Sequence, residues 1–356
     1  MGGQSEISAL VKSAATEAGF ELAGIAPVRQ FPELEHFESW IAAGHAGEMH
    51  YLEARDESGN LKRSSLQSAV PWARSVIVCA VNYNTSHPYS TRVDGTKQCW
   101  ISRYAWTKED YHESVMKRLR AVERKLQAVV PEVETRCYVD TGPLIERVYA
   151  KYAGVGWIGK NTCIINQRQG SWLFLGVILT SLDLAPDIPA PDRCGTCTRC
   201  IDACPTDAIT APYRLDSNRC IAYLTIEKRG SISEELCDGI GRHVFGCDIC
   251  QDVCPWNRKA PATTAPDFQA REELINPALE WLARLTAEEF REKFRHSAMR
   301  RTQRNGLRRN AVIAMGNSGD QYFLPLLDHL TKDEDPIIAE HAGWSANKLR
   351  TDSQPG

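Results

Sequence analysis

Two cysteine runs between residues 194 and 254 constrain this chain more than any other feature. The first run, CGTCTRCIDACP, has the bacterial ferredoxin spacing Cys-x2-Cys-x2-Cys-x3-Cys-Pro, which is typical of tetranuclear iron–sulfur clusters. In this pattern the first three thiolates bind one cluster and the fourth binds a second cluster. The second run, CDICQDVCP, repeats the end of the first, but Val244 stands where its leading cysteine would be. The second cluster therefore needs a ligand from elsewhere in the chain.

Cys220 is an upstream candidate for this displaced ligand, and Cys237 competes with it. We assign the role to Cys220, because Cys237 lies in a polar helical stretch. The predicted ligands are Cys194, Cys197, Cys200 and Cys254 for one [4Fe-4S] cluster, and Cys204, Cys220, Cys247 and Cys250 for the other. Structural zinc also uses Cys-x2-Cys pairs, but it does not require two interleaved runs that each end in Cys-Pro. Two adjacent clusters predict the transfer of single electrons.

The bulk properties are those of an ordinary globular protein with two or three domains, since the chain has 356 residues. The cysteines outside the clusters are scattered, which favours reduced thiols over a disulfide framework. The N-terminal region carries no secretory or twin-arginine signal, and no apolar run reaches membrane-spanning length. We therefore expect a cytoplasmic monomer that makes no contact with a membrane. The formal net charge of −3 gives no general attraction to nucleic acid, so any such binding needs a local basic patch.

Hydrophobic periodicity divides the chain into three predicted domains. Residues 1–185 alternate helical and strand patterns, which predicts an α/β (or α+β) domain. A proline-punctuated linker leads into a ferredoxin-like domain at 186–262, and a Pro- and Ala-rich connector leads into an all-helical domain at 263–356. Within the last domain, residues 307–350 predict one HEAT-like repeat and part of another, a module that forms concave binding surfaces.

The predicted elements of the first domain follow from the same patterns. Apolar residues recur at helical spacing near the N-terminus, again over a second segment rich in aromatic residues, and through a long segment that must end before Pro131. Strands are expected where short apolar runs are bounded by turns. The predicted helices cover 5–18, 32–54 and the region of 115–126, and the predicted strands cover 20–28, 76–81, a segment ending at Val139, and 171–184.

A basic run lies at the start of the helical domain. It contains six arginines and no acidic residue between Arg295 and Arg309. Such runs are usually solvated faces. This run, however, leads into a module suited to binding, and the rest of the chain is slightly acidic. Contact with a phosphate backbone therefore remains open as an alternative.

Asp140 is the most informative acid outside the cysteine runs. It follows a strand and begins the turn Asp140-Thr141-Gly142-Pro143, in which Pro143 suits a first helical position. The local sequence favours a helix-capping role, whereas a general acid at the end of a strand is the alternative. The helix should end at Gly154. The glycine-rich loop at 154–161 matches neither a Walker A nor a dinucleotide motif, but it allows close approach of a large flat or anionic ligand.

Several motifs, taken in order, resemble the epoxyqueuosine reductase family over nearly the whole chain. They are DTGPLIERVYAKYAGVGWIGKNT, SWLFLG, the two cysteine runs, RCIAYLTIE and LRRNAVIAMGN…AGWSANKL. The resemblance implies a cobalamin-dependent enzyme that contains two [4Fe-4S] clusters. Such an enzyme reduces epoxyqueuosine at the wobble position of tRNA with a GUN anticodon to queuosine, the last step of queuosine biosynthesis. It implies that cob(II)alamin is reduced to cob(I)alamin by electrons from an unidentified donor.

The resemblance also implies roles for individual residues. Asp140 matches the proton donor beside the cobalamin, and we expect burial there to raise its pKa. The implied cobalamin-binding residues are Arg63, Ser102, Ile164, Leu175 and Ile178, with Lys160, Asn161 and Thr162 in the matching glycine-rich loop. The implied tRNA-binding residues are Arg300, Arg301, Arg304 and Arg308. The segment 103–112 departs from the family pattern, because it lacks a glycine and is one residue longer, so the position of Ser102 is the least constrained.

Two other functions fit parts of the sequence. A corrinoid reductive dehalogenase would share the corrin and two clusters, but it typically carries a twin-arginine signal and has no use for a HEAT-like region. An iron–sulfur electron carrier with a helical interaction module would leave residues 1–185 without a role. Cobalamin binding separates the carrier from both enzymes.

Overall fold

The computed structural model describes residues 2–92 and 95–352. Its central sheet has four strands in the order β1-β2-β7-β4, and each neighbouring pair is antiparallel. The strands are β1 (Leu22–Pro27), β2 (Ser75–Asn82), β4 (Thr135–Tyr138) and β7 (Leu173–Thr180). The domain is thus of mixed helix and strand composition, and of the two expected arrangements the antiparallel sheet corresponds to α+β. Alternating strand and helix patterns do not fix strand direction, and here every hydrogen-bonded pair of strands in the sheet is antiparallel.

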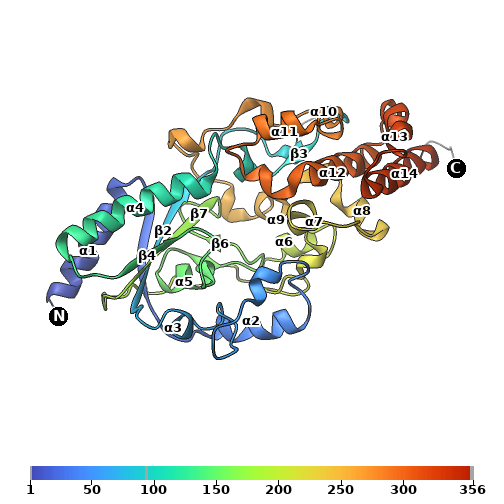
Figure 1. Ribbon diagram of the computed structural model, residues 1–356. Helices are drawn as coiled ribbons and strands as arrows, with labels where there is room; N and C mark the ends of the chain where they lie inside the picture. Colours follow the sequence, from blue (N-terminus) through green and yellow to red (C-terminus); the bar gives the residue numbers. More distant parts are fainter. Residues whose placement is uncertain (1, 93–94, 353–356) are drawn as a thin grey trace.

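Helices cover both faces of the sheet (Figure 1). One face packs against α1 (Gly2–Glu17) and α4 (Tyr111–Val129), and the other packs against α2 (Pro32–Ala42), α3 (Leu66–Ala69) and α5 (Glu146–Tyr152). β2 is buried along its whole length because it lies inside the sheet with helices on both sides. Such a strand reads as a continuous apolar run, which is why its position was predictable.

The boundaries of three helices show what local sequence can and cannot predict. Asp110 caps α4 by accepting the His112 N–H at 3.0 Å, and α4 ends before Pro131 as expected. The predicted helix over 32–54 is shorter, because α2 ends at Ala42 and Gly44 takes a left-handed φ of 73°. α5 begins at Glu146, so the prediction of Pro143 as its first residue is wrong.

The middle of the chain is made of short elements. They are β3 (Trp100–Ile101), β5 (Trp157–Ile158), β6 (Ile164–Ile165), α6 (Arg199–Asp202), α7 (Ile221–Ile226), α8 (Glu234–Ile240), β8 (His243–Phe245) and α9 (Ile249–Asp252). β3 pairs with β8 in parallel, and this pairing joins the first part of the chain to the cysteine-rich part. β5 and β6 form a separate antiparallel pair below the sheet.

The C-terminal part is helical. It contains α10 (Leu279–Ala283), α11 (Ala287–Lys293), α12 (Gln303–Asn317), α13 (Leu324–Leu330) and α14 (Pro336–Thr351). α12 packs against α10 and α14, and their core also includes Trp106 and Phe245 from the other two parts of the chain. The three parts therefore share apolar cores. Among the described residues no helix is long and apolar enough to cross a membrane.

Candidate functional site

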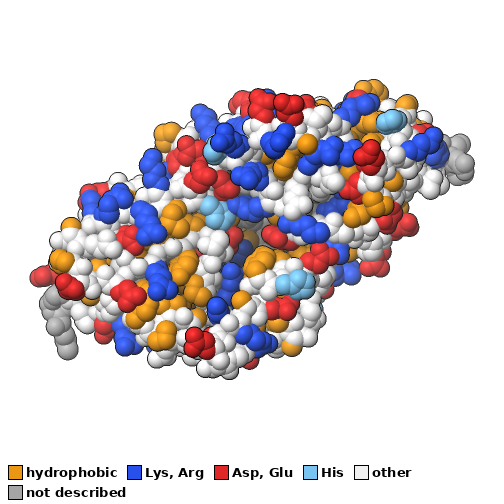
Figure 2. Space-filling view, viewed as in Figure 1, with side chains coloured by type: hydrophobic (Ala, Val, Ile, Leu, Met, Phe, Trp, Pro, Cys, Tyr) orange, Lys and Arg blue, Asp and Glu red, His pale blue; other side chains and the backbone are white. Residues whose placement is uncertain are grey.

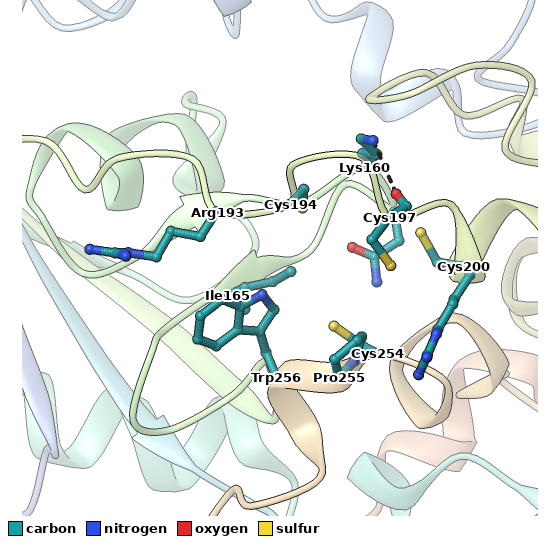
Figure 3. A pocket seen from close by; sticks show the side chains of 11 residues that line it. Lys160, Ile165, Arg193, Cys194, Cys197, Cys200, Cys254, Pro255 and Trp256 are labelled. Carbon is teal, nitrogen blue, oxygen red and sulfur yellow. Dashed lines mark hydrogen bonds between the residues drawn. The ribbon is translucent and has the colours of Figure 1, made fainter.

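The first predicted set of cluster ligands surrounds a cavity of about 270 Å³. Cys194, Cys197, Cys200 and Cys254 all line it, and Figure 3 shows sulfur atoms from separate segments facing the same space. Burial raises the pKa of the Cys200 thiol to about 11, and the charges of the other three thiolates add to this. A cationic cluster core would offset that cost, because thiolates are the form that binds metal. The space between the four thiols therefore fits a bulky cluster.

The second predicted set is also brought together. Burial raises the pKa of the Cys247 thiol, and the charges of Cys220 and Cys204 contribute to the same shift. The pKa of the Cys250 thiol is raised most by its hydrogen bond with Cys163 and then by burial, and the charges of Cys247 and Cys220 add to the shift. Cys237, in contrast, lies in α8, donates its S–H to the Ile232 carbonyl at 3.7 Å, and is affected by none of these four thiols. The geometry thus favours Cys220 over Cys237.

The loop at 159–163 braces both cysteine groups. The Lys160 ammonium donates to the carbonyl oxygens of Gly195 at 2.7 Å and Cys197 at 3.0 Å. The buried Asn161 amide donates to the Cys250 carbonyl at 3.2 Å. These side chains, which the family resemblance assigned to cobalamin, are engaged with the cluster-binding loops.

Asp140 lies at the other end of this region, with left-handed backbone at φ 62°. Its N–H donates to Glu146 Oε1 at 2.7 Å, and its Oδ2 accepts a hydrogen bond from the Tyr111 hydroxyl at 3.1 Å. Asp140 does not cap α5, whose N-cap is Ile145. Asp140 is exposed, because it begins a surface turn directly after the edge strand β4, and its burial beside a bound cobalamin stays a prediction.

Glu146 is an acid that the sequence did not single out. Desolvation raises its pKa to about 8, and the Asp140 charge adds to the shift, while Arg63 and Arg147 oppose it. Arg63 also lies 5.8 Å from the ring of Tyr51, which is 55% exposed. The structure therefore places the predicted Arg63 beside the Asp140–Glu146 pair.

Arg301 links this group to the helical part. Its Nη2 lies 3.1 Å from Asp110 Oδ1, and its guanidinium carbon lies 5.1 Å from the centre of the Tyr111 ring. Although burial opposes the shift, hydrogen bonding from His112 and the charge of Arg301 lower the pKa of Asp110 to about 2. Arg301 thus orients Tyr111, which is the hydrogen-bond partner of Asp140.

Comparison with known proteins gives two family matches. Residues 193–257 match a 4Fe-4S double cluster binding domain, and residues 63–141 match "Epoxyqueuosine reductase QueG, DUF1730". An epoxyqueuosine reductase of Xanthomonas campestris pv. campestris is 40% identical over 345 residues, which cover 96% of each chain. One of Synechocystis sp. is 45% identical over 293 residues, covering 81% of this chain and 98% of that one. The chain belongs to the epoxyqueuosine reductase family.

Solved structures of the family share the whole fold. A crystal structure of selenomethionine-labelled epoxyqueuosine reductase matches with a TM-score of 0.88 and 30% identity, over 97% of this chain and 90% of that one. An epoxyqueuosine reductase with an epoxyqueuosine-modified tRNA-Tyr stem loop matches with a TM-score of 0.87, at the same identity and coverage. The enzyme from Bacillus subtilis, with its catalytic aspartate loop swung out of the active site, has a TM-score of 0.85 at 30% identity.

The structure separates the residues that the family resemblance assigned to cobalamin. Ile164 and the half-buried Leu175 belong to the same apolar cluster on the α5 face of the sheet. Ser102 is buried, and its hydroxyl donates to Asp248 at 2.5 Å. Ile178 needs a correction: its side chain is fully buried on the α4 face, because residues three apart along a strand point to opposite faces. Thr162 takes φ 64°, and its carbonyl accepts a hydrogen bond from Arg147 at 3.1 Å.

The four arginines assigned to tRNA do not share one face. Arg300 is exposed, and Arg304 donates its Nε–H to the Leu285 carbonyl at 2.7 Å. Arg308 needs a correction, because it is 8% exposed and pairs with Asp333 at 2.5 Å. Arg300 and Arg301 precede α12, whereas Arg304 and Arg308 lie on it, and the helix turns Arg308 toward the core.

Proposed function

We propose that this protein reduces epoxyqueuosine at the wobble position of tRNA to queuosine and water. The reaction consumes two electrons and two protons for each epoxide. One observation supports this proposal most: the loop that contacts both cysteine groups through Lys160 and Asn161 also reaches Arg147, next to Glu146 and Asp140. An electron relay and a proton donor are therefore joined by a few residues.

Cobalamin is the proposed cofactor, and the residues present fit it. Tyr138, Ile158 and Leu175 pack on the apolar cluster of the sheet yet remain half-buried, so they offer apolar surface to a large flat ring. Figure 2 shows a hollow near the middle of the molecule, with Lys and Arg side chains around it. Bound cobalamin would supply a strongly reducing centre for the two-electron step.

Asp140 is the proposed proton donor to the epoxide oxygen. Opening the ring leaves negative charge on oxygen, and a carboxylic acid within hydrogen-bond reach neutralises it as the bond breaks. The Tyr111 hydroxyl occupies Oδ2, which directs Oδ1 toward the substrate. Glu146 positions Asp140 by accepting its backbone N–H. Because its pKa is about 8, Glu146 carries a proton at neutral pH and adds no second negative charge beside Asp140.

The helical part is proposed to be a HEAT-like module that holds the anticodon arm. Its exposed Arg300 and half-buried Arg304 are available for phosphate contacts, which position RNA without reading its sequence. A relative solved with an epoxyqueuosine-modified tRNA stem loop supports tRNA as the substrate. The wobble nucleoside must leave its stack to reach Asp140, as other enzymes that act on bases require.

The proposal is tested with epoxyqueuosine-containing tRNA, incubated anaerobically with reconstituted protein, cobalamin and a strong reductant. Mass spectrometry of the digested nucleosides should detect queuosine, which is one oxygen atom lighter. Asp140→Asn should retain clusters and corrin but lose conversion. Full conversion by this variant would refute the proton-donor role.

A further inference from the structure

A second concave surface lies against the cysteine-rich part, with a volume of about 860 Å³. Its walls include Arg199 of α6 and Ile249 of α9. Each of these helices also carries a predicted ligand, Cys200 in α6 and Cys250 in α9. Arg199 belongs to this surface and to the cavity of Figure 3 as well. The two concave surfaces therefore meet at Arg199, beside helices that carry predicted ligands of both sets.

Positive charge is concentrated on this area. Arg92, Arg193, Arg199 and Arg258, which we call the basic rim, are all exposed and line the two concave surfaces. With Lys160 they give five cations, against two acids, Asp202 and Asp252, in a protein whose formal net charge is −3. The basic rim is thus a local exception to the overall charge.

In the basic rim, Arg92 stacks on the Tyr89 ring, with its guanidinium carbon 4.6 Å from the ring centre, whereas arginines elsewhere in the protein form ion pairs. Arg118, Arg308 and Arg350 form ion pairs with carboxylates at 2.5–2.7 Å. Within residues 2–92 and 95–352, no ion pair with a carboxylate involves an arginine of the basic rim. Unpaired surface cations around a concave area attract an oppositely charged partner and speed its association.

Aromatic side chains lie among these cations. Trp256 lines the smaller cavity, while Tyr89 and Trp100 line the larger one, and all three are half-buried. Tryptophan, tyrosine and arginine are the residues most enriched at the centres of protein interfaces. The composition of the area is therefore that of a protein-docking surface.

We propose that the basic rim is the docking surface for a small acidic one-electron carrier protein, which reduces the two clusters. This inference rests on the proposed function, which requires two electrons per epoxide. Each encounter moves one electron from the reduced carrier into the protein, and no bond forms or breaks. Two encounters supply one turnover, and the protons come from the Asp140 side. RNA is the less favoured partner, because the basic rim surrounds the thiols and not Asp140.

The test compares charge reversal at the basic rim with charge reversal elsewhere, in holoprotein with both clusters. The test variant is Arg193→Glu/Arg199→Glu/Arg258→Glu. The control is Arg124→Glu/Arg291→Glu/Lys332→Glu, which changes the charge equally at exposed positions on α4, on α11 and after α13. The probe is a reduced plant-type [2Fe-2S] ferredoxin, an acidic protein, and bleaching of the cluster absorbance is followed by anaerobic stopped flow. Titration with oxidised ferredoxin gives the affinity independently of turnover.

At low salt, we expect ferredoxin to reduce the test variant at least about tenfold more slowly than the control. The difference between the two rates should be smaller at high salt. Its affinity for oxidised ferredoxin should fall in parallel. Photoreduced deazaflavin, which is small and uncharged, should reduce both variants equally. Equal rates with ferredoxin would overturn the proposal. So would a variant that keeps the ferredoxin rate but loses tRNA affinity, since the surface would then bind RNA. None of these readouts needs epoxyqueuosine, so they are independent of the proposed activity.

Discussion

The hydrogen bond from the Asp140 N–H to Glu146 leads to the most specific prediction. Asp140 holds a left-handed φ of 62°, which costs a non-glycine residue about 1 kcal/mol. The 2.7 Å bond to Glu146 contributes about 1 kcal/mol net, and more if Glu146 is charged. Replacing Glu146 by Ala removes the acceptor but keeps the backbone cost. The loop should then spend most of its time away from its reacting position, as in the relative whose catalytic loop is swung out.

The magnitude follows from these terms. A loss of about 1 kcal/mol of hydrogen bonding lowers the ratio of reacting to displaced loop by about fivefold. We expect kcat to fall by that factor in Glu146→Ala, with little change in KM for tRNA. Glu146→Gln keeps an oxygen acceptor and should retain most of the activity.

Hydrogen exchange gives a second readout that is independent of turnover. In peptides covering residues 138–146, the Asp140 amide should lose protection in Glu146→Ala and keep it in Glu146→Gln. Unchanged protection and unchanged kcat in Glu146→Ala would refute this reasoning. If kcat and amide protection fell equally in Glu146→Ala and Glu146→Gln, the carboxyl group itself, and not the hydrogen bond to an oxygen acceptor, would be what matters.

Three further predictions follow from the same geometry. Cys220→Ser should lose about half of the iron and the second cluster signal by electron paramagnetic resonance, whereas Cys237→Ser should keep the full iron content. Arg308→Ala should lower the free energy of unfolding by about 3 kcal/mol, because it leaves Asp333 unpaired, while Arg300→Ala should weaken tRNA binding and flatten its salt dependence without loss of stability. Glu146 binds its proton more tightly in the folded state, so the stability that this proton contributes is complete below the unfolded pKa of 4.5 and is lost as pH rises to about 8. Glu146→Gln should therefore flatten the dependence of the unfolding free energy on pH over that range. An unchanged dependence would contradict the pKa shift.

The cysteine spacing predicted which thiols of the first set the structure brings around one cavity, because most of them are neighbours in one run of the chain and their geometry is local. Cys220 lies outside both runs, and it was selected because its competitor Cys237 lies in a polar helical stretch. Strand direction was not predictable in this way. The same alternation of strands and helices is compatible with parallel and antiparallel sheets, and the packing of α4 against β7 is a long-range contact.

The residues around Asp140 show the same limit. Tyr111 is 29 positions from Asp140, and its hydroxyl reaches the carboxylate only because α4 and β4 flank the same edge of the molecule. Glu146 is close to Asp140 in sequence, but its hydrogen bond to the Asp140 N–H depends on a longer turn, because α5 begins at Glu146 and not at Pro143. Arg308 was wrongly grouped with Arg300, because a run of like charges does not indicate which side of α12 faces the core.

The central claim is that one site couples electrons from the clusters to protonation at Asp140. The most direct measurement is a single-turnover conversion of epoxyqueuosine-containing tRNA, followed by nucleoside mass spectrometry, with cobalamin present or omitted. We predict queuosine only when protein, cobalamin and reductant are all present, and none with Asp140→Asn despite intact clusters. Queuosine formed without cobalamin, or by Asp140→Asn at the rate of the unmodified protein, would contradict the account.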